Sequence, residues 1–303
     1  MTANRLTLTI LDPADAAPPG RKGKTGSRQQ DIEVHTLANG LTLALIPDQR
    51  VPLIHLQAAA RAGMPSETPA TNGVSQLLGS VMPKGTATRT AEEIAAGLEG
   101  LGASIAGSTG NNALLLQAAG LAPDFKAISN IFSEVLVSPS LPTDAVSREK
   151  ASQLAALEET LQDPLHAAFR AMRGAAFGGA GYGLDPLGSP DSLTTLDREI
   201  LSAHHARHIN TGNLAITVAG DFDSHEVVDL LSEQLAALDS KPGWQVPECL
   251  ASGGADVTVK LPKKQAVLAI GFPGAGVSDE DRHALAMIQE YAADMAGPLF
   301  TRI

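Results

Sequence analysis

Cysteine and basic residues are both scarce in this sequence. A single cysteine, Cys249, occurs among 303 residues, so the chain forms no internal disulfide and has no cysteine-rich zinc module. Lys and Arg number 22 against 33 Asp and Glu, which gives a formal net charge of -11. This balance argues against a general nucleic-acid binder and against a basic helix at a membrane surface.

Long apolar runs and aromatic side chains are also lacking. No stretch of about 18 apolar residues is present, so we expect no membrane span. Residues 1–30 contain no apolar segment of signal-peptide length, and we therefore expect a cytoplasmic location. Aromatic residues make up 3% of the chain while hydrophobic residues make up 44%, which predicts aliphatic, alanine-rich cores.

The length of the chain and the position of its Pro- and Gly-rich segment predict two unequal domains. Residues 1–30 are expected to form a flexible lead-in and residues 31–238 a complete domain. Residues 239–254 are rich in Pro and Gly and predict a linker. Residues 255–303 hold two strands and one helix, and the last residues carry no helix stop signal. We therefore expect an incomplete second domain and a chain that is a fragment.

Hydrophobic periodicity predicts an α+β fold. Asn39-Gly40 lies between two alternating runs and predicts a hairpin, and Thr90 with Glu93 predicts a capping box. The strands are expected at 34–37, 41–46, 53–60, 103–109, 113–119, 213–219, 257–261 and 266–272. The helices are expected at 73–82, 90–101, 124–137, 143–162, 164–176, 197–209, 224–238 and 279–296.

A histidine cluster is the first candidate for chemistry. His204 and His208 are four residues apart, the spacing of helical zinc sites, but no acid lies between them and Arg207 adds a positive charge. A helix end at which His208 interacts with terminal carbonyls is the favoured interpretation. The adjacent Glu158 and Glu159 predict a solvated acidic face, because neighbouring residues on a helix point in different directions.

The stretch from Gly73 to Thr86 reads G-V-S-Q-L-L-G-S-V-M-P-K-G-T. It resembles the zinc-helix region of the pitrilysin/insulinase-type peptidases, family M16, whose pattern is roughly G-x-x-H-x-x-E-H-x-x-x-K-G-T. In that family both histidines bind zinc and the Glu activates water. The matching positions here are Gln76, Gly79 and Ser80, which are poor zinc ligands and provide no base.

The resemblance also places the family's last zinc ligand. That ligand is a Glu in a long helix ending at an Asp-Pro boundary, which matches Asp163-Pro164 here, and counting back puts the ligand on Ala156. With all four positions replaced, the resemblance implies a protein without the catalytic residues. It also implies no metal and no other cofactor, although active relatives hold zinc.

Further motifs follow in family order. They include Asn39-Gly40-Leu41, Arg61-Ala62-Gly63, Gly188-Ser189-Pro190 and Val218 to Phe222, so the resemblance covers about residues 31–303. Leu101 to Ser104 lead into the strand that, in active relatives, pairs with substrate as an added strand. The resemblance therefore implies substrate contacts at Ser104, Ile105, Ala106 and Gly107, with Ala106 where the family usually has Asn.

The resemblance implies an antiparallel-rich sheet covered by helices, followed by the start of a second, similar domain. It implies a non-catalytic subunit that binds a peptide substrate and pairs with an active M16 metallopeptidase, or forms a homo-oligomer. One alternative is a scaffold subunit resembling the core proteins of respiratory complexes. Another is a zinc-dependent metalloendopeptidase that acts through an unrecognised site, such as the histidine cluster.

Overall fold

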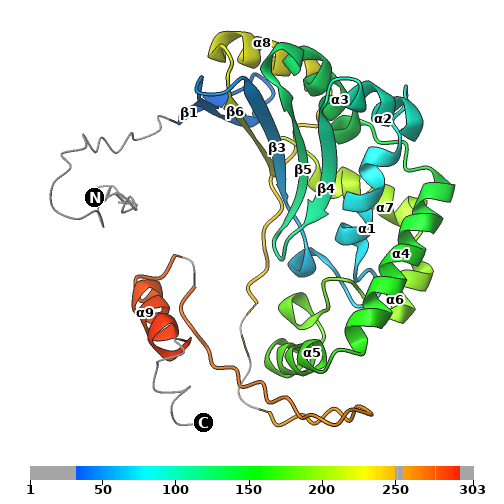
Figure 1. The fold of residues 1–303 in the computed structure, drawn as a ribbon, viewed down its shortest axis with the longest axis vertical. Coiled ribbons are helices and arrows are strands. Elements are labelled where there is room, and N and C mark those ends of the chain that lie inside the picture. The colour runs from blue at the N-terminus through cyan, green and yellow to red at the C-terminus, as the bar shows by residue number, and fades with distance from the viewer. Residues whose placement is uncertain (1–31, 250, 252–254, 277, 294–303) are drawn as a thin grey trace.

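A computed structural model describes residues 32–249, 251, 255–276 and 278–293. Its centre is a six-stranded sheet with the strand order β1-β2-β6-β3-β5-β4 (Figure 1). The strands are β1 (Glu33–Thr36), β2 (Thr42–Pro47), β3 (Leu53–Arg61), β4 (Ser104–Thr109), β5 (Ala113–Leu121) and β6 (Leu214–Gly220). The predicted lead-in, residues 1–30, lies outside the described residues.

Antiparallel pairing dominates this sheet. Only β2 and β6 run parallel among its neighbouring strands, and β3 pairs antiparallel with both β5 and β6. The predicted hairpin is confirmed: β1 and β2 are joined by a turn in which the Leu37 amide donates to the Leu41 carbonyl over 2.9 Å. Gly40 has a φ of 88°, a left-handed conformation that glycine adopts without strain.

One face of the sheet is covered by helices and carries the core. Along β3, Ile54, Leu56, Ala58 and Ala60 are all buried, and the residues between them are less buried. This alternation follows from the two-residue period of a strand. Helix α1 (Val74–Val81) packs on β4 and β5, α3 (Phe125–Val137) on β5, and α8 (Ser224–Gln234) on β2. Within the described residues, no helical layer covers the opposite face (Figure 1).

The remaining helices extend this layer or lie outside it. They are α2 (Ala91–Glu99), α4 (Thr143–Leu161), α5 (Pro164–Phe177), α6 (Pro190–Thr195), α7 (Arg198–His208) and α9 (Arg282–Ala293). The predicted capping box of α2 is present, with Thr90 and Glu93 exchanging side-chain and backbone hydrogen bonds. The short α6 was not predicted, although Pro190 at its first turn follows a Ser189 capping box. No helix in the described part of the chain has the length and apolar character needed to cross a membrane.

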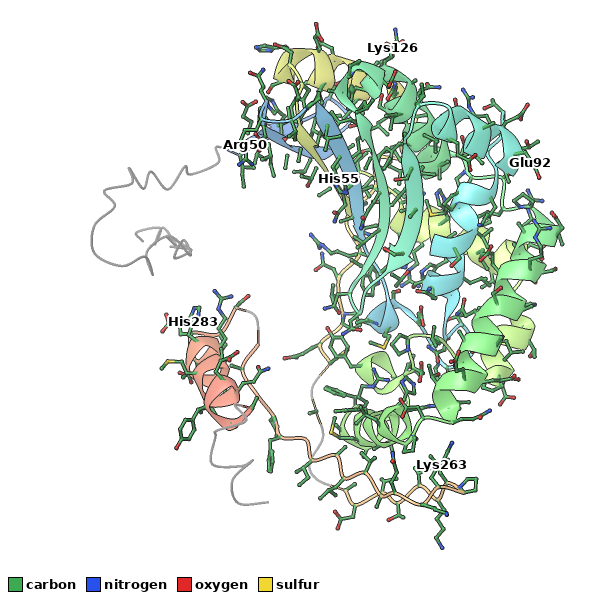
Figure 2. All side chains as sticks on the ribbon, viewed as in Figure 1. Arg50, His55, Glu92, Lys126, Lys263 and His283 are labelled. Carbon is green, nitrogen blue, oxygen red and sulfur yellow. The ribbon has the colours of Figure 1, made fainter. Side chains whose placement is uncertain are left out.

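The predicted strands at 257–261 and 266–272 are wrong for this structure. Neither run forms a strand, and the apolar side chains Leu268 and Phe272 are 83% and 85% exposed. An alternating run becomes a strand only where a partner strand and a core receive it, and the described residues supply neither here. Figure 2 shows side chains projecting from this stretch, near Lys263, and from α9, near His283. Glu158 and Glu159 are exposed, as predicted.

The first part of the predicted linker packs against the sheet domain. The Thr211 amide donates to the Asp239 carbonyl over 3.0 Å, and the Trp244 ring meets the His208 ring edge-on at a centroid distance of 5.3 Å. Gly212 and Gly243 approach so closely that a Cβ on either would overlap the backbone of the other segment. Residues 239–244 therefore continue the sheet domain, and a division of the chain at this point stays a prediction.

Candidate functional site

Helix α1 lies directly on the edge strand β4. The Thr109 hydroxyl donates to the Ser75 carbonyl over 2.9 Å, and one turn further along the helix Gly79 touches Gly107. A Cβ at Gly107 would overlap the Gly79 carbonyl oxygen, so the contact requires glycine on the strand. The two glycines bring the backbones of helix and strand together.

Helix α4 borders α1 on its other side and runs antiparallel to it. The Gln153 amide donates to the Gly73 carbonyl over 3.1 Å at the start of α1. Lys84 forms an ion pair with Glu149 over 3.2 Å just beyond the other end of α1. Ala156 lies one helical turn after Gln153, and therefore on the side of α4 that borders α1.

The four positions that match the zinc and catalytic residues lie where α1, α4 and β4 adjoin. Gln76 and Ser80 are half-buried on the stripe of α1 between its β4-facing side and its α4-facing side. Gly79 is buried against β4, and Ala156 lies one turn from Gln153, on the side of α4 that borders α1. We name this surface, made of Gln76, Ser80, Ala156 and the adjoining edge of β4, the notch. Among the described residues, no three His, Cys, Asp or Glu side chains are arranged to hold a metal ion.

The walls of the notch are uncharged. Charged residues make up 18% of the chain, yet none occurs in Val74–Val81, in Ser104–Thr109 or in Ala151–Leu157. The Gln76 side-chain amide has no hydrogen-bond partner among the described residues, and the Ser80 hydroxyl donates to the Gln76 carbonyl over 3.2 Å. The notch therefore offers neutral hydrogen-bonding groups and no ion.

The free edge of β4 adjoins the notch. The Gly110 amide donates to the Ala113 carbonyl, and an antiparallel ladder alternates, so every second residue back along β4 is bonded to β5. The backbone groups of Ile105, Gly107 and Thr109 consequently point away from β5, toward the open edge. Of the predicted substrate-binding residues, Ser104 and Ala106 are exposed on the face of the sheet opposite α1.

The three histidines of α7 contact three different elements. His204 Nε2 lies 3.0 Å from the Ser75 hydroxyl of α1, and His205 Nε2 lies 2.9 Å from the Leu136 carbonyl of α3. His208 Nδ1 donates to the Arg61 carbonyl at the end of β3 over 2.9 Å. The predicted partner of His208 was therefore wrong: the ring bonds to a strand end and not to carbonyls of its own helix.

Burial keeps these histidines neutral. It lowers the pKa of His204 to about 3, with further lowering from the nearby His208 and Arg207, and it lowers the pKa of His208 to about 4. The pKa of His205 is also lowered by burial. The cluster, which the sequence offered as a possible metal site, forms structural contacts in this fold.

Two family profiles match the chain. The profile described as "Insulinase (Peptidase family M16)" matches residues 56–188, which include α1, β4 and α4, and "Peptidase M16 inactive domain" matches residues 195–303.

The chain belongs to the M16 peptidase family. A similar curated protein is "Mitochondrial-processing peptidase subunit beta" of Blastocladiella emersonii, 26% identical over 98% of this chain and 65% of that protein. Another is "Uncharacterized zinc protease" of Rickettsia felis, 23% identical over 91% of this chain and 67% of that protein. This M16 chain therefore spans about two thirds of the length of these relatives.

Two solved structures share the fold. The peptidase M16 inactive domain from Pseudomonas fluorescens superposes with a TM-score of 0.68 at 24% identity, covering 72% of this chain and 53% of that one. A protease from Helicobacter pylori superposes with a TM-score of 0.66 at 19% identity, covering 73% and 53%. The predicted helix-covered sheet of an M16 domain is confirmed.

Glu67 is a residue at the start of α1, outside the notch, that sequence reasoning missed. It is 6% exposed, and its carboxylate accepts from the Gly73 and Ser75 amides and from the Asn72 side chain. It thereby satisfies free amides at the start of α1, where a negative charge is favoured. The sequence signal is weak, because Glu67 stands six residues before Gly73 and fits no local capping motif.

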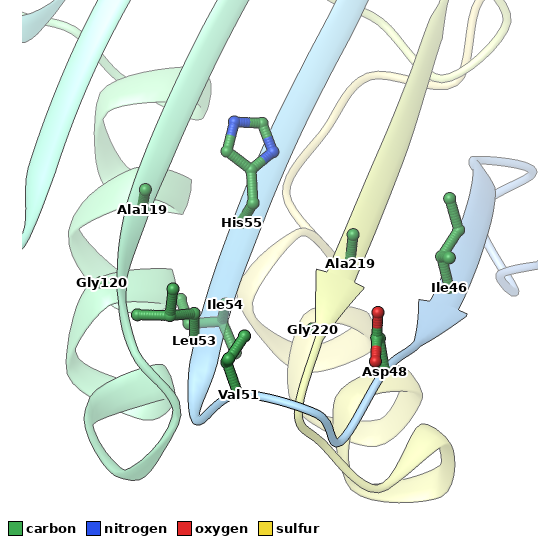
Figure 3. A pocket seen from close by; sticks show the side chains of 10 residues that line it. All are labelled: Ile46, Asp48, Val51, Leu53, Ile54, His55, Ala119, Gly120, Ala219 and Gly220. Atoms are coloured by element: carbon green, nitrogen blue, oxygen red, sulfur yellow. The ribbon is translucent and has the colours of Figure 1, made fainter. Parts of the chain in front are cut away.

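A pocket lies on the other face of the M16 sheet, away from the notch (Figure 3). Its polar side chains are His55 and Asp48, and Arg50 holds Asp48 in a hydrogen-bonded ion pair. The other lining residues are apolar or glycine: Ile46, Val51, Leu53, Ile54, Ala119, Gly120, Ala219 and Gly220. None of the predicted site residues lines this pocket.

Proposed function

We propose that this chain is a non-catalytic M16 protein that binds a peptide in extended form and pairs with an active M16 metallopeptidase subunit. The observation that carries the proposal is the uncharged notch. Gln76, Gly79, Ser80 and Ala156 lie where α1, α4 and β4 adjoin, and none of them supplies a zinc ligand or a general base.

The open edge of β4 supports the peptide-binding part of the proposal. The backbone groups of Ile105, Gly107 and Thr109 are directed outward, and an extended peptide can add to them as a further strand. Gly107 also has no side chain, so a peptide backbone can approach it closely. The substrate contacts implied for Ser104, Ile105, Ala106 and Gly107 thus divide into backbone contacts and contacts on the open face.

The relatives support the pairing part. The Blastocladiella relative carries the name of a subunit, and the Rickettsia relative carries the name of a zinc protease. A chain without the zinc residues requires a catalytic partner if it is to take part in proteolysis. The proposed partner is therefore an M16 chain with an intact His-x-x-Glu-His helix.

The experiment is native affinity purification of the tagged chain from its own cells, with metal analysis and a peptidase assay of the purified chain alone. We expect an M16 partner with an intact His-x-x-Glu-His motif, substoichiometric zinc and no chelator-sensitive cleavage. Recovery of respiratory-complex subunits instead would support the scaffold alternative. Stoichiometric zinc with chelator-sensitive cleavage by the lone chain would overturn the proposal in favour of a peptidase.

A further inference from the structure

The side-chain chemistry of the notch restricts what a bound peptide can place there. Side chains alternate along a strand, and residues paired across two strands point to the same face of the sheet. The side chain of Gly107 would point toward α1, where Gly79 lies. A peptide residue paired opposite Gly107 therefore directs its own side chain toward the α1 stripe that carries Gln76 and Ser80.

The notch has hydrogen-bonding capacity for that side chain. Gly79 and Gly107 have no side chains and lie in contact, and Ala156 has only a methyl group, so the polar side chains of the notch are those of Gln76 and Ser80. The Gln76 amide is free to donate and to accept, because no described residue bonds to it. The Ser80 hydroxyl donates to the Gln76 carbonyl and keeps its lone pairs for an incoming donor.

Charge and hydrogen bonding together decide the class of side chain. A charged side chain would lose hydration in the notch without a counter-ion, because α1, β4 and the facing stretch of α4 are uncharged. An apolar side chain would cover the Gln76 amide and leave it unpaired. A side-chain amide or hydroxyl avoids both penalties.

We propose that Gln76 and Ser80 form a specificity subsite that receives an uncharged polar side chain, such as Asn, Gln or Thr, from the peptide residue paired opposite Gly107. This inference rests on the proposed peptide-binding role and adds its selectivity. The notch contains no charged residue, so we expect the net charge of -11 to affect peptide binding through other parts of the surface.

The test uses four fluorescein-labelled decapeptides that differ only at three alternate central positions, which carry Asn, Leu, Lys or Glu. Binding to the full chain is measured by fluorescence anisotropy at high salt, which screens the overall charge. We expect the Asn peptide to bind about five- to tenfold more tightly than the Leu peptide, and also more tightly than the two charged peptides. Gln76→Leu is expected to abolish or reverse the preference of Asn over Leu.

Two further variants separate the subsite from the strand edge. Ile105→Pro removes an amide that points outward from β4 and spares the bonds to β5, so it is expected to weaken all four peptides alike. Gln162→Leu alters an exposed glutamine at the end of α4 and is expected to change nothing.

The outcomes distinguish the two proposals. If the peptides bind and Ile105→Pro weakens them, but Gln76→Leu keeps the wild-type preference, the subsite is refuted while peptide binding stands. If no peptide binds, or Ile105→Pro has no effect, the proposed function fails and the subsite fails with it. A ratio of Asn to Leu affinity near one for the wild type also overturns the subsite.

Discussion

Two polar regions lie on different sides of helix α1. On one side the histidines of α7 are buried and bonded to Ser75, Leu136 and Arg61; on the other the notch leaves the Gln76 amide without a partner. Ser75 and Gln76 are neighbours in sequence, yet each belongs to a different region. The residues with the stronger metal-binding chemistry are thus the ones already used in packing.

The difference teaches that residue type alone does not locate a site. A buried polar atom with a partner stabilises the fold, because losing that partner leaves an unsatisfied group. A polar atom at an open edge without a partner is available to a ligand. The predictions below test whether the two regions of α1 divide in this way.

The largest effect on stability is expected at Gly107, where β4 contacts α1. Gly107→Val forces a side chain into the Gly79 backbone and should destabilise the protein by about 3 kcal/mol. Chemical denaturation measures this loss. Ala106→Val, which alters the exposed neighbour on the other face, is the control and should change stability by less than about 0.5 kcal/mol. Equal losses at both positions would show that the close approach of α1 and β4 does not matter.

The histidine side should respond to acid. The unfolded chain takes up protons at these histidines near pH 6.5, whereas the folded pKa values of His204 and His208 are about 3 and about 4. Stability is therefore complete above pH 6.5 and falls as the pH decreases, by about 1.4 kcal/mol per pH unit for each histidine. By pH 5 each should cost about 2 kcal/mol.

Unfolding free energies at pH 7.5 and pH 5.0 measure this acid response. His204→Gln should reduce the loss between the two pH values, and His225→Gln, at an exposed position, should not. The same loss in all three proteins would contradict the assignment of the acid response to α7.

Two serines of α1 give a smaller and more direct contrast. Ser75→Ala removes the hydroxyl bonded to His204 and should destabilise the fold by about 1 kcal/mol. Ser80→Ala removes a half-buried hydroxyl bonded only to a carbonyl of its own helix and should cost less than about 0.5 kcal/mol. Thermal or chemical unfolding of both variants decides the order, and a greater loss for Ser80→Ala would reverse it.

The smallest effect on stability is expected at Gln76. Gln76→Leu breaks no hydrogen bond of the side chain, so unfolding free energy should stay within about 0.5 kcal/mol of the wild type. A loss above 1 kcal/mol would place Gln76 with the structural residues and remove the contrast between the two regions.

Local patterns were sufficient to predict most of the sheet domain. The Asn39-Gly40 hairpin, the Thr90–Glu93 capping box and the alternating run of β3 each depend on neighbours in sequence, and each formed as predicted. The runs at 257–261 and 266–272 had a similar pattern but no described partner strand, and they formed no strand. A β-strand forms only when it pairs with another strand, so an alternating sequence pattern alone does not predict one.

The candidate site was predictable in part. The M16 resemblance gave Gln76, Gly79, Ser80 and Ala156, and the fold places them where α1 and α4 adjoin. It did not give the Glu67 cap or the contact of His208 with Arg61, because both depend on distances between elements that sequence spacing does not encode. The absence of charge from the notch could not be predicted, because it depends on three separate uncharged stretches of the sequence that adjoin only in the folded structure.

The packing of Trp244 on His208 provides an intrinsic fluorescence probe. Trp244 is the only tryptophan of the sequence, so the tryptophan emission of the protein, excited selectively over its two tyrosines, comes from one known place. That place is where residues 239–244 leave the sheet domain. Emission recorded during unfolding, partner binding or acid titration therefore reports whether this junction is still docked, without any added label.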